Sequence, residues 1–255
     1  MESDATRRFS SRVEDYIRYR PSYPAGLIHV LERECGLTPS SKIADIGSGT
    51  GFLGTHFLQL GCEVFGVEPN AEMRAAGERL LAGELRFHSI DGRAESTPLP
   101  AASVDFVAAG QSFHWFDRPA ARREFERILR TGGWCVLVWN ERLVEGPFLE
   151  EYEALLQRYA PDYAQVDHRR MDSQVMDEFF GAGQWKLASL PNEQLFNLDG
   201  LLGRLHSSSY APRAGSPEYE AINRDITALY ARCALGGVVP FRYETKIYYG
   251  QLSTT

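Results

Sequence analysis

Five short apolar segments alternate with segments of helical periodicity over the first 140 residues of this 255-residue chain. The apolar segments are 42–46, 63–67, 85–88, 104–109 and 134–139. Their length and their β-branched and aromatic residues predict strands. Parallel strands need crossover helices, so the alternation predicts an α/β fold with a doubly wound, mostly parallel sheet.

The segments between these strands carry apolar residues on one helical face and end at glycines. Helices are expected at 51–60, 70–82 and 119–130, the second of them capped by Asn70.

Two more strands are expected late in the chain. Segments 185–190 and 194–198 together indicate one bent or interrupted strand, and 245–252 indicates a final strand. Strands that follow so late, with helices between them, favour a sheet edge that is finished by an antiparallel pair. The complete expectation is a seven-stranded, Rossmann-like, mostly parallel sheet with one late antiparallel strand.

The rest of the chain is helical and charged. We expect a single domain over 1–255, with its core at about 36–140 plus the late strands near 185–198 and 245–252. The segments at about 141–184 and 198–240 would then form a helical cap over the carboxyl ends of the strands. Doubly wound sheets bind their ligands at that edge.

Charge and composition exclude several classes of partner. The net charge of −7 and the pI near 5.5 disfavour nucleic acids, because such binding depends on neutralising phosphates. No uncharged apolar run is long enough to cross a bilayer, so no membrane role is expected. Four scattered cysteines show no metal-type spacing, so we expect no metal site. Free thiols indicate a reduced compartment, so we expect a cytoplasmic protein. We further expect either a monomer or a homodimer.

The stretch "KIADIGSGTGFLG" (42–54) places four glycines between the first strand and the first helix. Its "GTGFLG" portion fits the dinucleotide-binding pattern, and Glu68 stands where a ribose-binding acid is expected, so an NAD(P)-binding oxidoreductase is one interpretation. Asp45 opposes it, because a carboxylate beside the turn would repel a pyrophosphate. An acid at that position suits a ligand with a positive centre and no phosphate.

An apolar strand that ends in Asp-x-Gly-x-Gly-x-Gly resembles the first motif of the class I S-adenosylmethionine-dependent methyltransferases. Four later stretches are similar to that family in order and spacing, so the resemblance covers about residues 12–140. They are "VEPNAEM" (67–73), "GRAESTPLP" (92–100), "SVDFVAAGQSFHWFD" (103–117) and "ILRTGGWCVLVW" (128–139). "YRPSYP" (19–24), "SFHWFD" (112–117) and "SSSYAP" (207–212) are similar to the type 11, small-molecule branch that includes trans-aconitate methyltransferases.

The resemblance implies a cofactor site for S-adenosylmethionine, whose product is S-adenosylhomocysteine. Asp45 would orient the methionyl amino group, and Glu68 would accept both ribose hydroxyls. Pro69 and Met73 would lie near the adenine. The turn residues Gly47, Ser48, Gly49, Thr50 and Gly51 would let the backbone approach the cofactor.

The adenine loop departs from the family pattern. Arg93 stands where the family usually has an acid or amide, although Ala94 can still offer its backbone N–H. Asp91 or Glu95 would then supply the acceptor for the adenine amine.

The exit of the fourth strand bears on the reaction. Gly110 and Gln111 line the cofactor in the resemblance, and they replace the Asn/Asp-Pro-Pro motif of enzymes that methylate exocyclic amines. His114 is a candidate general base, with packing or hydrogen bonding as its alternative role. Further substrate-binding candidates in this region are Trp115, Trp139 and Asn140.

The two ends of the chain supply the remaining candidates. Tyr16 and Arg20 would fold over the cofactor, with Arg20 facing the methionyl carboxylate. In the late cap, a basic and hydroxylated cluster would hold an acidic substrate unless it is a solvated face. The cluster consists of Arg204, His206, Tyr210 and Arg213.

The sequence therefore predicts an enzyme that transfers a methyl group from S-adenosylmethionine to a small organic molecule by in-line displacement. Oxygen methylation of a carboxylate or hydroxyl is the first expectation, and carbon methylation of a quinone- or phenol-like ring is the alternative. Two other classes stay open, namely the NAD(P)-binding oxidoreductase and a regulator that binds the cofactor without catalysis.

Overall fold

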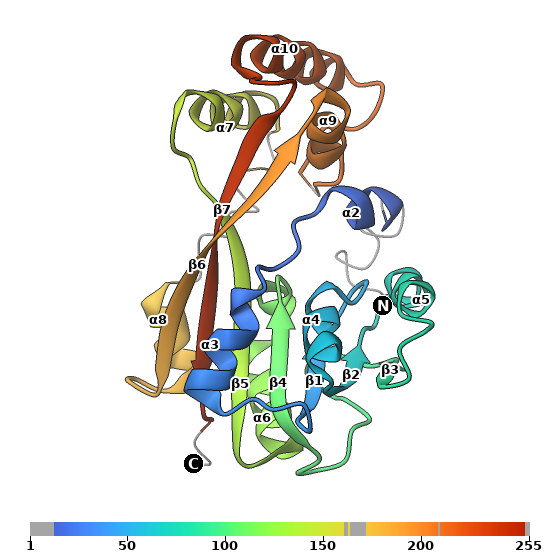
Figure 1. Ribbon diagram of the computed structural model, residues 1–255, viewed down its shortest axis with the longest axis vertical. Coiled ribbons are helices and arrows are strands. Elements are labelled where there is room, and N and C mark those ends of the chain that lie inside the picture. The colour runs from blue at the N-terminus through green and yellow to red at the C-terminus, as the bar shows by residue number, and fades with distance from the viewer. Residues whose placement is uncertain (1–12, 161–162, 164–171, 209, 253–255) are drawn as a thin grey trace.

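The computed structural model describes residues 13–160, 163, 172–208 and 210–252. Its centre is a seven-stranded sheet with the order β3-β2-β1-β4-β5-β7-β6 (Figure 1). β7 runs antiparallel to both β5 and β6, and the pairs from β3 to β5 are parallel. The predicted fold class is confirmed. The strands are β1 (Lys42–Ile46), β2 (Glu63–Val67), β3 (Phe87–Ile90), β4 (Val104–Gly110), β5 (Leu129–Arg142), β6 (Trp185–Phe196) and β7 (Val239–Gly250).

Helices cover both faces of the sheet because successive strand residues point to opposite sides. Ile43 of β1 packs with Leu27 and Phe57 on one side, where α3 and α4 lie. The next residue, Ala44, packs with Phe125 on the other side, where α6 and α8 lie. The helices around the core of the sheet are α3 (Gly26–Cys35), α4 (Phe52–Leu60), α5 (Ala71–Leu80), α6 (Arg118–Ile128) and α8 (Ser173–Phe180), together with the 3₁₀ turn η1 (Phe113–Trp115).

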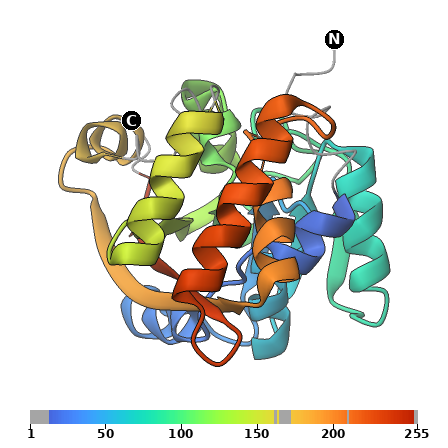
Figure 2. The ribbon, with the colours of Figure 1, turned by 90° about the horizontal axis from the view of Figure 1, so that it is seen from above.

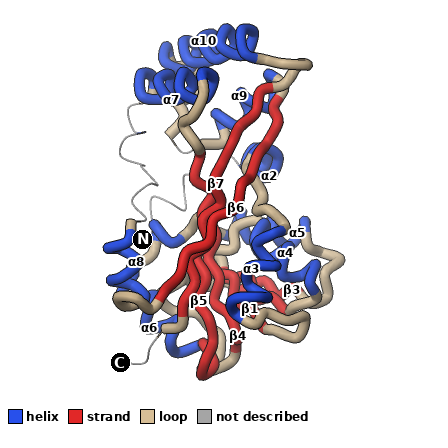
Figure 3. The backbone as a smooth tube through the Cα atoms, turned by 60° about the vertical axis from the view of Figure 1, so that its left-hand side comes forward, coloured by secondary structure: helices blue, strands red, loops and turns tan. Residues whose placement is uncertain are grey.

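A second group of helices stands beyond the carboxyl ends of β1 and β4. β5, β6 and β7 extend past the core and carry this group, which we call the cap (Figures 1 and 3). Seen from above, α7 and α10 lie side by side, and α9 and α2 follow on the side of α10 away from α7 (Figure 2). The cap has its own apolar core around Phe241 and Tyr152. Its helices are α7 (Pro147–Tyr159), α9 (Leu198–His206) and α10 (Pro217–Cys233), with the N-terminal helix α2 (Val13–Tyr19) beneath them.

Several strand boundaries differ from those predicted. β6 is one continuous strand of 12 residues through Pro191, and β7 begins at Val239 rather than at 245. β5 continues from Leu129 to Arg142, well past the apolar run 134–139. The cause is pairing: β7 bonds along β5 as far as Arg142 and along β6 as far as Phe196. Cross-strand partners therefore set these boundaries, and local hydrophobicity does not show them.

The segment after α2 is fixed between the cap and the core. Asn140 and Asn192 donate their side-chain N–H groups to the Ser22 carbonyl at 3.2 and 2.8 Å, and Gln194 donates to the Tyr19 carbonyl at 3.3 Å. These bonds place α2 and the residues that follow it over the sheet edge.

No helix of the described residues is long and apolar enough to cross a membrane.

Gly203 of α9 tests this arrangement, because the Tyr19 ring lies directly against it. A Cβ at position 203 would sit 2.2 Å from Tyr19 Cε2. We expect Gly203→Ala to displace Tyr19 and to lower the free energy of unfolding by about 1–3 kcal/mol, despite the better helix propensity of alanine. Gly83→Ala is the control, since nothing lies within 4 Å of its Cβ position. Equal urea-unfolding midpoints for the two variants would contradict this packing.

Candidate cofactor and acceptor site

Two adjoining hollows lie at the carboxyl ends of β1, β2 and β4. The order of the strands reverses between β1 and β4, which is where doubly wound sheets bind ligands. The hollows hold about 820 and 800 Å³ of empty space, part of it open to solvent. Tyr16, Gly47, Gly49, Gly110, Gln111 and Trp115 line both, so the two form one continuous site.

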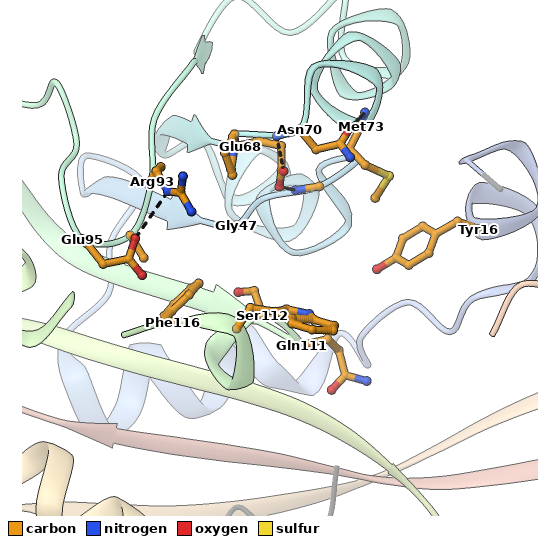
Figure 4. Close-up of a pocket in the computed structure, with 15 residues that line it drawn as sticks. Tyr16, Gly47, Glu68, Asn70, Met73, Arg93, Glu95, Gln111, Ser112 and Phe116 are labelled. Carbon is orange, nitrogen blue, oxygen red and sulfur yellow. Dashed lines mark hydrogen bonds and ion pairs between the residues drawn. The ribbon is translucent and has the colours of Figure 1, made fainter. Parts of the chain in front are cut away.

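The first hollow is organised by Glu68, at the end of β2 (Figure 4). Its carboxylate accepts the Gly49 N–H at 2.9 Å and the Asn70 N–H at 2.8 Å, one on each oxygen. Burial raises the pKa of Glu68, and these two bonds partly offset the rise. Since each oxygen has accepted one N–H, each keeps a lone pair for a ligand hydroxyl.

The glycine turn between β1 and α4 is held against the end of β2. Gly47 and Ser48 donate their N–H groups to the Val67 carbonyl at 2.8 and 3.2 Å. Gly47 has φ +66°, and a Cβ there would lie 2.6 Å from Ser112 Cβ. Only glycine suits this conformation and this contact, so the turn brings bare backbone to the site.

Asp45 is the most unusual group of the second hollow. The side chain is 1% exposed, and neither carboxylate oxygen has a hydrogen-bond partner among the described residues. Burial raises the pKa of Asp45 to about 7; the nearby Gly54 N–H opposes the rise, and the charge of Glu68 adds to it. A buried carboxylate without a partner is costly, so the site favours a cationic or hydrogen-bond-donating ligand.

The exit of β4 is held in a strained conformation. Gln111 has φ +57°, which is uncommon for a residue with a side chain. Its side-chain amide donates to the Asn140 carbonyl at 3.3 Å and accepts the Asn140 N–H at 3.2 Å. The adjacent Ser112 donates its hydroxyl to the Ile46 carbonyl at 2.9 Å. These bonds fix the turn that begins η1.

Three aromatic side chains meet beyond this turn. The His114 ring lies 4.4 Å from Trp115 and 5.1 Å from Trp139, measured between ring centroids. All three line the second hollow, and Trp115 is 41% exposed at its mouth. Phe113, fully buried against Phe179, anchors the turn from below.

The loop after β3 closes the first hollow with charged and small residues. Arg93 and Glu95 both line it, with Arg93 Nε 3.9 Å from Glu95 Oε2 (Figure 4). Glu95 also accepts the Asp117 N–H at 2.9 Å. The other predicted acceptor, Asp91, pairs with Arg74 and is not among the residues that line either hollow.

The N-terminal segment covers the site from above. The Tyr16 side chain points from α2 toward the hollow, across from Gly47 and Gln111 (Figure 4). Arg20 lines the second hollow, lies 5.5 Å over the Tyr16 ring and donates to the Ser207 carbonyl at 2.9 Å. This segment therefore connects the wall of the second hollow with the cap.

Most of the predicted site residues lie around these hollows. Those that line one or both are Tyr16, Arg20, Asp45, Gly47, Ser48, Gly49, Thr50, Glu68, Pro69, Met73, Arg93, Ala94, Glu95, Gly110, Gln111, His114, Trp115 and Trp139.

Seven predicted residues lie outside the lining, namely Gly51, Asp91, Asn140, Arg204, His206, Tyr210 and Arg213. Gly51 is at the start of α4, and Asn140 is buried in its bonds to Gln111 and Ser22. Tyr210 lies in the cap, and Arg213 is exposed. Among the described residues no cluster of three or more His, Cys, Asp or Glu could hold a metal ion.

Sequence reasoning missed several lining residues. Asn70 was expected only as a helix cap, and its side chain does accept the N–H groups of Glu72 and Met73. Ser112 and Phe116 belong to the quoted "SFHWFD" stretch, so their position at the strand exit was the available signal. Tyr23 lies in the quoted "YRPSYP" stretch and Phe52 in the glycine stretch 42–54, so their place in these motifs was the available signal.

Comparison with known proteins identifies the domain. Residues 44–137 match the family described as a methyltransferase domain. An uncharacterized methyltransferase of Schizosaccharomyces pombe is 33% identical over 156 residues, which are 60% of this chain and 60% of that protein. A methyltransferase-like protein of the same organism is 29% identical over 227 residues, covering 86% of this chain and 84% of its own length. A solved structure from Anaeromyxobacter dehalogenans, provisionally named a type II methyltransferase, shares the fold with a TM-score of 0.64 at 23% identity, covering 93% of this chain and all of that one.

The matched family segment runs from β1 into β5 and includes the glycine turn and the ends of β2 and β4. Over this segment the chain is similar to methyltransferases, and over most of its length it shares their fold. The chain spans about 60% of the first of these relatives, and none of the three comparisons names an acceptor.

The raised pKa of Asp45 makes stability depend on pH. The folded protein holds this proton up to about pH 7, whereas an unfolded aspartate releases it near 3.8. The stabilisation is therefore complete below pH 4 and is lost as pH rises through 7. We expect Asp45→Asn to raise the free energy of unfolding of the ligand-free protein by up to about 4 kcal/mol at pH 8, and by much less at pH 5. Urea unfolding at both pH values measures this, and a difference that does not change with pH would contradict it.

Proposed function

We propose that this protein transfers the methyl group of S-adenosylmethionine to an oxygen, in a carboxylate or hydroxyl, of a small organic acceptor. The unpartnered, buried carboxylate of Asp45 carries the proposal. Asp45 lines the second hollow and Glu68 the first, and Gly47 and Gly49 of the glycine turn line both. A ligand with a cationic amino group and a ribose would satisfy both acids at once.

The amino-acid end of the cofactor is assigned to the second hollow. Asp45 would accept hydrogen bonds from the methionyl ammonium, and that contact would return its pKa toward the ordinary range. Arg20 would face the methionyl carboxylate, since its Nε has no hydrogen-bond partner among the described residues. Gly47, Ser48 and Thr50 would form the wall between them.

The adenosyl end is assigned to the first hollow. Glu68 would accept both ribose hydroxyls through the lone pairs left by its two backbone bonds. Met73 and Pro69 would pack on the adenine, and Ala94 would offer its backbone N–H. Between the two predicted acceptors for the adenine amine, Glu95 is favoured over Asp91, because only Glu95 lines the hollow.

The methyl group would then point toward His114, Trp115 and Trp139. Methyl transfer from a sulfonium is an in-line displacement, so the protein's main task is to align the acceptor oxygen and exclude water. Aromatic faces tolerate the positive charge of the sulfonium as it moves. His114 is placed to take the proton of a hydroxyl acceptor, whereas a carboxylate needs no base.

Other reactions fit the site less well. A pyrophosphate would face the charge of Asp45 beside the glycine turn, which argues against a nicotinamide dinucleotide. Stabilisation of the protein by NADH and not by S-adenosylhomocysteine in a thermal-shift assay would reverse that argument. Carbon methylation of a phenol-like ring stays the second candidate, favoured by the aromatic wall of His114, Trp115 and Trp139.

Binding of S-adenosylhomocysteine tests the assigned acids. Asp45→Asn and Glu68→Gln should each weaken it by about 1.5–3 kcal/mol, the scale of a lost charge-assisted hydrogen bond, as measured by titration calorimetry. Glu63→Gln is the matched control, because Glu63 begins the same strand at its opposite end and pairs with Lys42. If both site variants bind as tightly as the control, the assignment is wrong.

Kinetics with labelled cofactor test His114. In a screen of small acids, phenols and amines, an acidic or hydroxylated acceptor should be methylated. For a hydroxyl acceptor, His114→Gln should lower kcat about 10²–10⁴-fold and remove the pH dependence near the histidine pKa. For a carboxylate acceptor the loss should stay below about tenfold, since no proton is removed. Methylation of amines alone would contradict the proposal.

A further inference from the structure

Three arginines lie between the cap and the site, Arg204 buried and Arg142 and Arg20 partly buried, and the described residues offer them one carboxylate. Arg204 is 6% exposed, the Arg142 side chain is 10% exposed, and Arg20 lines the second hollow. The carboxylate is that of Glu153, 7% exposed, which pairs with Arg142. Arg20 and Arg204 form no salt bridge with any described carboxylate.

Arg204 is held by neutral groups. It donates to the Tyr243 hydroxyl at 3.2 Å and to the Ser208 hydroxyl at 2.8 Å. Its guanidinium lies 5.7 Å from the centre of the Phe241 ring. These contacts orient the side chain without neutralising its charge.

Arg142 reaches the same aromatic ring from β5. Its guanidinium is 5.8 Å from the centre of Phe241, and it donates to Glu153 and to the Tyr163 hydroxyl. Its Nη1 is buried and has no hydrogen-bond partner among the described residues. Arg142 and Arg204 thus belong to one cluster around Phe241.

Arg20 links this cluster to the methyl-transfer site. Arg20 donates to the carbonyl of Ser207, and the neighbouring Ser208 accepts a hydrogen bond from Arg204. The Nε atom of Arg20 has no hydrogen-bond partner among the described residues. Burial lowers the pKa of Arg20, and the positive charge of Arg204 lowers it further. Burial would raise the pKa of Tyr210, but Arg204 and Arg142 bring it below its usual value. The interior of the cap is therefore positive, although the whole chain carries a net charge of −7.

We propose that Arg204 and Arg142, with Arg20 at the edge, bind an oxyanion of the acceptor, a carboxylate or a phosphate, remote from the atom that takes the methyl group. This inference rests on the proposed function. Guanidinium groups recognise planar or tetrahedral oxyanions through several N–H donors, and buried ones require a counter-charge. The acceptor is thus a small organic anion held beneath the cap.

The residues that form the basic cluster of the cap differ from those expected from the sequence. The expected cluster combined Arg204 with His206, Tyr210 and Arg213. His206 instead bonds Asn223 and stacks on Tyr219, and Arg213 is exposed. Arg204 and Tyr210 stay in the cluster, which is completed by the two arginines from β5 and the N-terminal segment.

Direct binding tests this site without a known acceptor. The full chain is saturated with S-adenosylhomocysteine and titrated with citrate, with inorganic phosphate and with neutral glycerol as a blank. We expect citrate or phosphate to raise the unfolding temperature, and the tighter of the two to identify the kind of oxyanion. Arg204→Gln should weaken that binding at least tenfold and leave the affinity for S-adenosylhomocysteine unchanged. Arg224→Gln is the control, an exposed arginine on the cap helix α10.

A purely structural role for Arg204 gives a different result. It would lower the unfolding temperature of Arg204→Gln in the absence of any anion, and Arg204→Lys would restore both stability and the full wild-type anion affinity. In our proposal Arg204→Lys recovers part of the anion binding. If Arg204→Gln does not fold, Arg204→Lys provides the same comparison, with a smaller loss of anion binding and an unchanged affinity for S-adenosylhomocysteine.

Two results would overturn the inference. One is that neither anion stabilises the wild-type protein, and the other is that the Arg204 variants bind the anions as the wild type does. Failure of the proposed function is seen separately, as an absence of S-adenosylhomocysteine binding in the first step.

Discussion

The hydrogen-bonded ladder of β5, β7 and β6 is the feature on which the rest of the structure depends. β7 pairs with β5 from Gly250 to Tyr243 and with β6 over the full length of that strand. One end of the ladder is buried in the parallel core, and the other end carries the cap (Figure 3). Because the same strands belong to both layers, Arg142 and Tyr243 are placed relative to the carboxyl ends of β1 and β4 by backbone pairing rather than by a flexible linker. The core and the cap are therefore two walls whose relative placement the sheet itself fixes.

The two walls carry opposite, uncompensated charges. On the core side, Asp45 and Glu68 are buried acids with raised pKa values. On the cap side, Arg204 and Arg20 have neutral partners. Buried charged groups without ionic partners lower the stability of the ligand-free protein. Direct ion pairs between these acids and these arginines would remove that cost, but they would leave no site for a ligand. Among the described residues no ion pair joins the two sets, and Arg20, Asp45 and the aromatic side chains of Tyr16, His114 and Trp139 all line the second hollow. A sulfonium cofactor with an ammonium group and an anionic acceptor would complete both sets.

Local patterns predicted the parallel core well because its strands are short, buried and bounded by glycine turns. β1 and β2 match the predicted 42–46 and 63–67, and the acids at their ends lie at the hollows as the motifs implied. Their roles toward the cofactor stay predictions. The later strands were harder because partners decide their length: Arg142 lies in β5 only since β7 continues beside it. Nor can periodicity show that Gln111 adopts a positive φ, because its two bonds to the distant Asn140 hold that conformation.

Ligand binding and stability are linked through these same groups. A ligand that binds only the folded state stabilises it in proportion to the logarithm of its concentration over its dissociation constant. Where binding also satisfies a buried charge, the ligand-free protein bears a cost that the complex lacks. Asp45 and the cap arginines lie on different elements, joined by the segment that runs from Tyr16 to Ser22. Arg20 in this segment lines the second hollow and also donates to the carbonyl of Ser207 in the cap. Cofactor binding that orders Arg20 would thereby order one edge of the oxyanion site, so the cofactor and the anionic acceptor should bind with positive cooperativity.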